Sequence, residues 1–336
     1  MSDELEPIEP DEAVQMYLHE RRPEVASSTL QSHEYRLKHL LRWCQQEDVD
    51  NLNELSGRDL HRYKLWRQED GDLTKASLKT QMDTVRVFVR FCESIDAVVP
   101  DLHEKVLSPT LSGSDNQRDV MLESERAEEI LGHLRRFEYA SLEHILLRLL
   151  WRTGVRAGGV RALDVDDYDS DEERLKVQHR EATPLKNKDD GERYIALTTE
   201  TCTVVEDWLA YERPDVIDDE GREPLLATKQ GRPHISTVRD IVYRWTRPCQ
   251  YGSGCPHDRD PDECEAEKHG HASKCPSSVS SHAVRRGAIT HFLTEDVPEK
   301  VVSDRMNVSQ EVLDQHYDRR SEEVKVEQRR EYLDEM

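Results

Sequence analysis

The chain has 336 residues, of which 35% are hydrophobic and 35% charged, with only 14 Gly and 14 Pro. This composition excludes a largely disordered protein, and the length allows two domains with separate cores. The formal net charge of −23 argues against a nucleic-acid partner unless local basic surfaces survive. Because carboxylate-rich surfaces keep proteins soluble in molar salt, we interpret this charge as a sign of a halophile.

The sequence favours a cytoplasmic protein without a membrane partner. No apolar stretch approaches the ~20 residues that span a bilayer, and the N-terminus, MSDELEPIEPDE, is acidic where a signal peptide would be basic. Cysteines stay reduced in such a compartment. Three of them occupy apolar helical stretches and are predicted to be core residues: Cys44, Cys92 and Cys202.

Residues 1–104 are predicted to form a helical domain. Apolar residues recur at helical spacing from about residue 27, a second helix is expected from about residue 56, and a third over 74–94. At ~100° per residue, four cations of the third helix fall within an arc of about 60°: Lys75, Lys79, Arg86 and Arg90. We predict that this basic stripe contacts phosphate groups of a ligand, and an ordinary solvated face is the alternative.

The second half of the chain follows a linker. Residues 105–119 (KVLSPTLSGSDNQRD) combine Pro, Gly and Ser without periodicity, which predicts a linker before a second domain over 120–336. Amphipathic helices are expected over 122–137 and 142–153. Between 164 and 197 the segments RLKVQHR and RYIAL flank a polar KNKDDGE turn, which predicts a β-hairpin, and helices then resume. The fold class is therefore mainly α with a small β-sheet.

Four features that can carry chemistry follow one another in the second domain: TGVR with Arg156, the turn with Lys186 and Lys188, HAVR with His282 and Arg285, and HYDRR with Tyr317. Each alone has a structural explanation, such as a helix C-terminal contact for the first arginine or a packed aromatic for the tyrosine. Together, two arginines, a histidine and a lysine suit a phosphodiester, because each guanidinium can fork onto phosphate oxygens. In that field a tyrosine becomes a usable nucleophile, so phosphoryl transfer without a metal is predicted.

The order and spacing of these features resemble the tyrosine recombinase, or phage integrase-like, family. The similar segments lie within residues 145–325 and are TGVRAGGVRAL, KNKDDGERYIAL, SHAVRRGAITHFL and DRMNVSQEVLDQHYDRR. The resemblance implies a helical core-binding domain joined to a tyrosine-recombinase catalytic domain. It also implies a site-specific enzyme that cleaves and rejoins double-stranded DNA through a 3′-phosphotyrosine link, without a catalytic cofactor, as a homotetramer on two DNA sites.

The resemblance also assigns roles to single residues. Arg156 and Arg285 would hold the scissile phosphate, His282 would assist proton movement, and Tyr317 would attack the phosphorus. A lysine of the hairpin turn would protonate the leaving 5′-oxygen.

Two lysines of that turn are candidates for the acid. Lys188 is our choice because it precedes Arg193 by the interval that the family shows, and Lys186 is the alternative.

Two positions depart from the family pattern. Gly159 stands where the family usually has an acidic residue, so support for the second-box residues has to come from elsewhere. Asn307 stands where the family usually has His or Trp, and we expect its amide to donate a hydrogen bond to a phosphate oxygen. A missing donor could cost ~2.7–4 kcal/mol of transition-state stabilisation. Two rival functions therefore stay open: a DNA-binding regulator on the same scaffold and, less favoured, a type IB topoisomerase.

A Cys/His-rich insertion at 249–275 precedes the second box. Its cysteines are Cys249, Cys255, Cys264 and Cys275, with histidines between them. Thiolates and imidazoles in a short polar insertion are typical of structural zinc sites. We predict one non-catalytic zinc held by the four cysteines, and free surface cysteines are the alternative.

Overall fold

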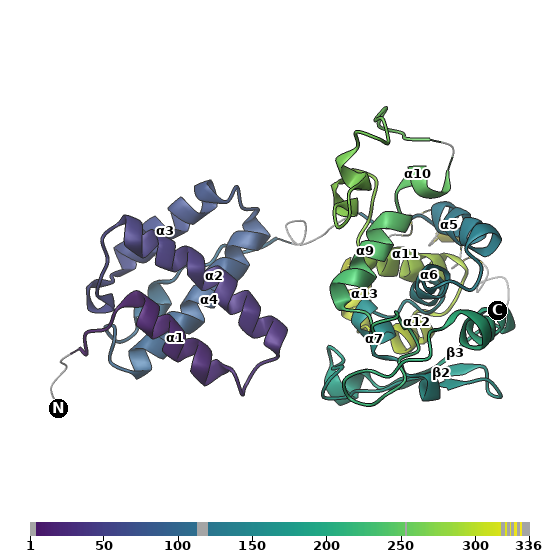
Figure 1. Cartoon of the computed structure of the whole chain (residues 1–336). Coiled ribbons are helices and arrows are strands. Elements are labelled where there is room, and N and C mark those ends of the chain that lie inside the picture. The colour runs from purple at the N-terminus through teal and green to yellow at the C-terminus, as the bar shows by residue number, and fades with distance from the viewer. Residues whose placement is uncertain are drawn as a thin grey trace. The chain divides into compact units, whose positions relative to one another are not determined.

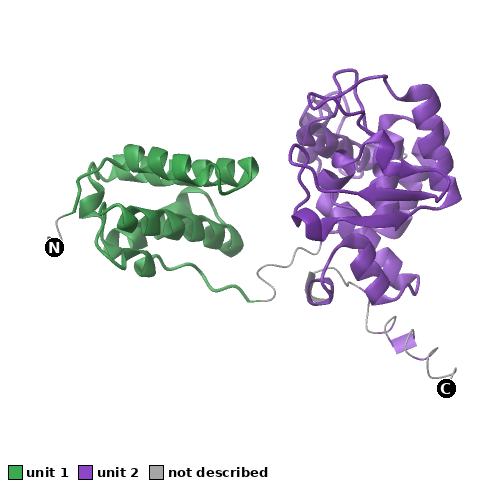
Figure 2. Cartoon of the chain, turned by 90° about the horizontal axis from the view of Figure 1, so that it is seen from below, with its two compact units in different colours: residues 1–117 green, residues 118–336 purple. Residues whose placement is uncertain are grey.

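The computed structural model describes residues 5–112, 120–252 and 254–316, and further along residues 320, 323, 326, 327 and 330. The chain divides into two compact units, residues 1–117 and 118–336 (Figures 1 and 2). This division falls within the predicted linker, 105–119. None of the helices in the described ranges has the length and apolarity that a bilayer span needs.

The first unit is helical, as the spacing of apolar residues predicts. Its helices are α1 (Pro10–Arg21), α2 (Ser27–Gln46), α3 (Gly57–Asp70) and α4 (Lys75–Ser94), with the short 3-10 turns η1 (Leu52–Glu54) and η2 (Leu102–Lys105). Ser56 starts α3 through a capping box with Asp59, and Thr74 caps α4. The predicted core cysteines of this unit, Cys44 and Cys92, are 2% and 1% exposed.

The first unit extends past the predicted start of the linker. Val106 is fully buried in the core of this unit. The hydroxyl of Ser108 donates to the Asp83 carboxylate at 2.6 Å, which attaches this residue to α4. Residues 106–108 therefore pack on the helices of the first unit.

The second unit is built around α6. Its α-helices are α5 (Ser124–Phe137), α6 (Leu142–Thr153), α7 (Ala157–Ala162), α8 (Thr199–Asp207), α9 (Ile235–Trp245), α10 (Pro248–Tyr251), α11 (Ser281–Thr294), α12 (Glu299–Met306) and α13 (Gln310–His316). A π-helical turn, η6 (Trp208–Glu212), continues α8. Helices α5 and α11 pack against α6 (Figure 1).

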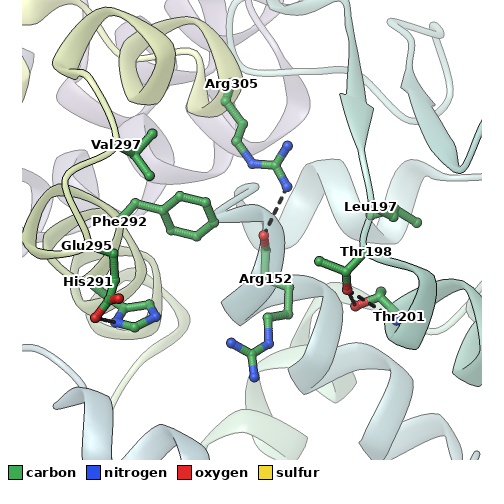
Figure 3. A pocket seen from close by; sticks show the side chains of 9 residues that line it. All are labelled: Arg152, Leu197, Thr198, Thr201, His291, Phe292, Glu295, Val297 and Arg305. Atoms are coloured by element: carbon green, nitrogen blue, oxygen red, sulfur yellow. Dashed lines mark hydrogen bonds and ion pairs between the residues drawn. The ribbon is translucent and has the colours of Figure 1, made fainter.

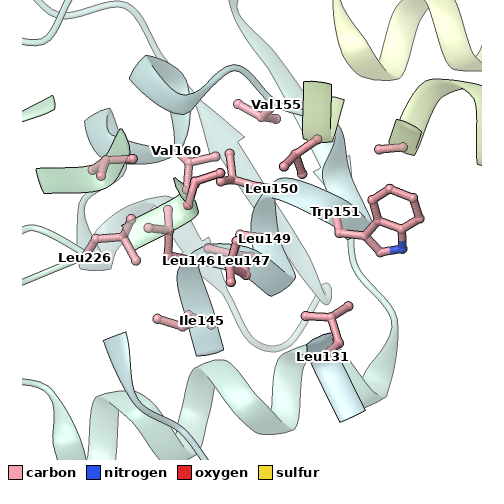
Figure 4. Close-up of a cluster of buried hydrophobic side chains, with 14 of the residues drawn as sticks. Leu131, Ile145, Leu146, Leu147, Leu149, Leu150, Trp151, Val155, Val160 and Leu226 are labelled. Atoms are coloured by element: carbon pink, nitrogen blue, oxygen red, sulfur yellow. The ribbon is translucent and has the colours of Figure 1, made fainter. Parts of the chain in front are cut away.

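Helix α6 is buried nearly all round, as expected of a helix inside a domain. Ile145, Leu146 and Leu149 are fully buried, and Trp151 is 1% exposed (Figure 4). At ~25 cal/mol per Å² of apolar surface, each of these side chains contributes roughly 1.5–3 kcal/mol by burial. The end of α6 is therefore rigidly placed, and Arg156 follows three residues after it.

Helix α11 approaches the start of the second unit closely. A Cβ at Gly287 would lie 1.9 Å from the carbonyl oxygen of Leu122, so glycine alone permits this packing. The Leu122 amide also donates to the Ala283 carbonyl at 3.1 Å. These contacts fix the helix that carries His282 and Arg285.

A small antiparallel sheet confirms the predicted hairpin. Its strands are β1 (Tyr168–Asp169), β2 (Arg174–Val177) and β3 (Arg193–Ala196), in the order β1-β2-β3. Leu175 pairs with Ile195, and both face the core. The fold is thus mainly helical with a small sheet, as predicted.

Candidate active site

The first two arginines come from different elements but meet at helix ends. Arg156 immediately precedes α7, after Gly154 has ended α6 in the left-handed conformation (φ 61°). Arg285 lies in α11 and is 1% exposed. A buried arginine needs partners for its donors, because an unpaired buried charge is costly.

Those partners are backbone carbonyls at helix C-termini. Three arginines, here called the arginine cluster, donate to successive carbonyl oxygens at the end of α12: Arg193 to Arg305 at 2.7 Å, Arg285 to Met306 at 2.7 Å and Arg156 to Asn307 at 3.4 Å. Arg285 also donates to the carbonyl of Gly154 at the end of α6. The last carbonyls of a helix lack intrahelical partners and form the negative end of its dipole. Helix ends therefore orient these arginines without a carboxylate in these contacts.

The contacts of Arg285 show what supports this residue although position 159 is a glycine and not an acidic residue. A Cβ at this buried position would lie 2.7 Å from Cγ1 of Val155, so an acidic side chain does not fit without a shift. The support of Arg285 comes instead from the ends of α6 and α12.

His282 stands among cations. The residue is exposed, yet desolvation lowers the pKa of its imidazole, and the neighbouring Arg285, Arg156, Arg286 and Lys186 lower it further. Each of these neighbours is positively charged, so an anion placed among them would be stabilised.

The same field acts on Arg193. Burial lowers the pKa of its guanidinium to about 10, and the neighbouring Arg285, Arg156 and Arg305 add to this effect. The site therefore concentrates positive charge, and a bound phosphate group would compensate this charge.

Lys186 and Lys188 have different surroundings in the turn. Lys186 is the lysine whose charge lowers the pKa of His282. Lys188 instead begins the 3-10 turn η5 (Lys188–Gly191) in a left-handed conformation (φ 48°). We call residues 186–191 the lysine loop. Which of the two lysines is the acid stays a prediction.

Asn307 is engaged differently from our prediction. It ends α12 in the left-handed conformation (φ 48°), which Asn tolerates better than most residues. Its Nδ2 donates to the carbonyl oxygen of Asp190 at 2.6 Å, and its Oδ1 accepts from Nδ2 of Asn187. The amide thus holds the lysine loop, and its expected role as a phosphate donor stays a prediction.

The predicted nucleophile, Tyr317, lies outside the described residues. Helix α13, which precedes it in the sequence, is attached to α12 through an apolar cluster. Leu313 is fully buried there with Val302 and Met306. The helix that anchors the arginine cluster therefore also anchors the helix that leads to Tyr317.

Arg193 and Arg305 are site residues that the sequence analysis did not assign. Arg193 shares the inward face of β3 with Ile195, two residues further on, so the alternation of the strand was an available signal. The carbonyl oxygen of Arg305 accepts from Arg193 of the arginine cluster, and its Nη2 donates to the Arg152 carbonyl at 3.1 Å. Its side chain lines a pocket of about 210 Å³ beside Phe292 (Figure 3).

The basic stripe on α4 is only partly available to a ligand. Arg86 donates to the Val106 carbonyl at 2.6 Å and to the Ser108 hydroxyl at 3.0 Å, so we reassign it to a structural role. Lys79 pairs with Asp83 at 2.5 Å. Two further members of the stripe are exposed: Lys75 and Arg90.

The cysteine-rich insertion packs on α9 through Arg247, whose Nη1 donates to the Ala266 carbonyl at 2.6 Å. Desolvation raises the pKa of Cys249, and the nearby thiols of Cys275 and Cys255 raise it further. Cys264 is half-buried. Within the described ranges, no three His, Cys, Asp or Glu side chains are arranged as a metal site. The zinc site stays a prediction.

Comparisons with known proteins bear on the class of protein. The sequence matches the phage integrase family over residues 121–323 and the phage integrase N-terminal SAM-like domain over residues 15–94. The chain belongs to the phage integrase family. Membership confirms the predicted class of function, site-specific DNA recombination.

Solved structures show the same fold. The integrase of transposon Tn1549 in complex with a circular intermediate DNA is 14% identical, with a TM-score of 0.64, covering 96% of this chain and 99% of that chain. A lambda integrase dimer bound to a COC′ core site is 12% identical, with a TM-score of 0.64, covering 94% of this chain and 97% of that chain. The N-terminal domain of a phage integrase/site-specific recombinase from Haloarcula marismortui is 34% identical, with a TM-score of 0.30, covering 31% of this chain and 99% of that chain. None of the curated proteins matches the chain.

Proposed function

We propose that this integrase cleaves and rejoins duplex DNA through a 3′-phosphotyrosine intermediate formed by Tyr317. The observation that carries the proposal is the arginine cluster, anchored on helix C-termini beside His282 and Lys186. Donors held in place before the reaction stabilise charge that develops in the transition state. Such a site suits the transfer of a phosphodiester between two oxygen nucleophiles.

The proposed reaction assigns one task to each side chain. The guanidinium groups of Arg156 and Arg285 bind the non-bridging oxygens, and the phenolic oxygen of Tyr317 attacks phosphorus while the bond to the 5′-oxygen breaks. The lowered pKa of His282 favours its neutral form, which can accept the phenolic proton. Lys186 gives its proton to the leaving 5′-oxygen. A 5′-hydroxyl of a second DNA end reverses these steps, so rejoining needs no nucleotide.

We propose duplex DNA as the ligand and a homotetramer on two DNA sites as the working assembly, in the cytoplasm of a cell with high salt. DNA-bound integrases among the solved structures support the ligand, and one of them, lambda integrase, is a dimer on its core site. The charge of −23 supports the high-salt environment.

The test is covalent attachment to DNA. Wild-type protein, Tyr317→Phe and the matched control Tyr243→Phe are incubated at high salt and with EDTA on nicked duplex that carries the repeats flanking the gene. We expect a denaturation-resistant adduct for wild type and Tyr243→Phe, and DNA binding without an adduct for Tyr317→Phe. Binding by wild type without an adduct would instead support the regulator. Relaxation of a plasmid that lacks the site would support the topoisomerase.

We also propose one structural zinc in the insertion, held by Cys249, Cys255, Cys264 and Cys275. The support is the concentration of thiols in 249–275. Elemental analysis of protein folded in zinc-containing buffer should give about one zinc per chain, and chelation should lower its melting temperature. A zinc content near zero would contradict the proposal.

A further inference from the structure

We propose that Asn307 is a positioning residue, which holds the lysine loop so that Lys186 can protonate the leaving oxygen. This inference rests on the proposed function and adds to it a residue that acts through another. It replaces the expectation that the Asn307 amide binds the phosphate directly.

The side chain of Asn307 bridges two points of the lysine loop. Its Nδ2 donates to the carbonyl of Asp190 at 2.6 Å, and its Oδ1 accepts from the side chain of Asn187. Asn187 directly follows Lys186 in the sequence. The amide therefore uses its acceptor and one donor to hold the segment that carries the acid.

The loop needs such a connection because its central residues are otherwise exposed. Lys186, Asn187 and Lys188 are all exposed, whereas Leu185 before them and Gly191 after them are buried. Fixing a long flexible side chain costs conformational entropy. A hydrogen bond beside Lys186 reduces the freedom of the backbone from which the ammonium group extends.

The backbone of Asn307 connects the same residue to the arginine cluster. Its carbonyl oxygen accepts from Nη1 of Arg156 at 3.4 Å, and the preceding carbonyl, of Met306, accepts from Arg285 at 2.7 Å. One residue thus contacts the lysine loop through its side chain and a phosphate-binding arginine through its main chain. This geometry sets the acid relative to the phosphate.

The left-handed backbone of Asn307 (φ 48°) offers a clean variant. Glycine adopts this conformation without strain, so Asn307→Gly removes the amide and leaves the carbonyl in place. Asn187→Ala removes the partner on the loop and should reproduce the defect. Arg156→Ala serves as a control that damages phosphate binding, and Asp189→Ala, at an exposed position of the same loop, as a control without a catalytic role.

The decisive readout uses two DNA substrates. In the second substrate the 5′-bridging oxygen at the cleaved bond is replaced by sulfur. A thiolate leaves without a proton far more readily than an alkoxide, since a thiol has a pKa of about 8.5. A variant that only misplaces the acid is therefore rescued by sulfur, and a variant that loses a phosphate donor is not.

We expect Asn307→Gly and Asn187→Ala to cleave the ordinary substrate about 10-fold more slowly, and Lys186→Ala about 100-fold or more. All three should cleave the sulfur substrate within about 3-fold of the wild-type rate. This difference is much smaller than the rate loss expected when acid catalysis is removed. Arg156→Ala should be slow on both substrates and Asp189→Ala normal on both. Melting temperatures and DNA binding of each variant show that folding is retained.

If Asn307→Gly cleaved both substrates equally slowly, the positioning role would be wrong. The Asn307 amide would then be a direct hydrogen-bond donor to the phosphate. Normal cleavage of the ordinary substrate by Asn307→Gly would overturn any role of the amide. If wild type cleaved neither substrate on a site that it binds, the proposed function itself would fall, and this inference with it.

Discussion

Cations gather on α4 in the first unit and in the arginine cluster in the second, but their partners differ. On α4 the carboxylate of Asp83 accepts from both Lys79 and Arg86. In the cluster, Arg285 donates to the carbonyls of Gly154 and Met306 at two helix ends. In these contacts the cations of α4 pair with an acid, whereas the arginines of the cluster donate to the negative ends of helix dipoles.

The pKa values of the two regions express this difference. Desolvation would raise the pKa of Asp83, yet the hydrogen bonds from Lys79 and Ser108 lower it overall, so the charges there are satisfied. Burial and neighbouring cations lower the pKa of Arg193 to about 10, so positive charge in the cluster is disfavoured until an anion enters. The count of basic residues is therefore a poor guide to phosphate binding, and the nature of their partners is a better one.

The largest effect should follow removal of a cluster arginine. Arg285→Ala should slow cleavage by ~10²–10³, the loss typical of one preorganised donor to a developing anion. Arg285→Lys should also be slow, because an ammonium group cannot fork onto two acceptors. Single-turnover cleavage measures this, and Arg86→Ala is the matched control that should keep its cleavage rate. The loss of a preorganised donor should slow cleavage far more than about 3-fold. A cleavage rate of Arg285→Ala within that limit of wild type would therefore show that the arginine cluster stabilises the transition state no better than the cations of α4.

Removal of Arg86 should instead affect stability. Arg86→Ala leaves the Val106 carbonyl and the Asp83 carboxylate without one donor each. We expect the free energy of unfolding to fall by about 1–2 kcal/mol, in the range for hydrogen bonds to charged groups that are partly exposed. Arg90→Ala, on the exposed side of the same helix, should change it by less than about 0.5 kcal/mol. Urea denaturation of the full chain tests both variants, and equal stabilities would contradict the reassignment of Arg86.

The sequence predicted the parts of the fold that depend on local order. The apolar spacing located α4 and α6, a helix was expected from about residue 56, where α3 begins, and the alternating segments located the hairpin. Each of these signals needs only residues within one or two turns of one another.

The partners of the site residues could not be predicted in this way. Arg285 and Met306 lie 21 residues apart, and Arg285 and Gly154 lie 131 apart. The helical spacing on α4 likewise made Arg86 and Arg90 equal candidates for phosphate contacts. It could not show that Arg86 donates to the Val106 carbonyl, which comes from 20 residues later in the chain. Tertiary contacts decide such cases.

A smaller effect should separate Arg90 from Arg86 in DNA binding. If Arg90 contacts a phosphate, Arg90→Ala should flatten the slope of log K against log[salt] by ~0.9, since one counterion fewer is released. Arg86→Ala should leave this slope unchanged, because its guanidinium is used within the first unit. Fluorescence anisotropy over a series of salt concentrations measures the slope. Identical slopes for wild type and Arg90→Ala would make the remaining stripe an ordinary solvated face.

The smallest effect concerns the proton on His282. In the free protein, desolvation and the cations Arg285 and Arg156 lower the pKa of its imidazole, which favours the neutral ring. A phosphate among these cations stabilises the imidazolium and should raise this pKa. Between the lower pKa of the free protein and the higher pKa of the complex, binding takes up a proton, so DNA affinity should increase as the pH falls through that interval.

Histidine NMR titrations of free and DNA-bound protein measure the two pKa values directly. Calorimetry in two buffers of different ionisation enthalpy counts the protons taken up, and His282→Asn should abolish the uptake. The satisfied pair of Lys79 and Asp83 on α4 should show no comparable change, because its charges already have partners. A His282 pKa that is the same with and without DNA would mean that the phosphate does not enter the field of the arginine cluster.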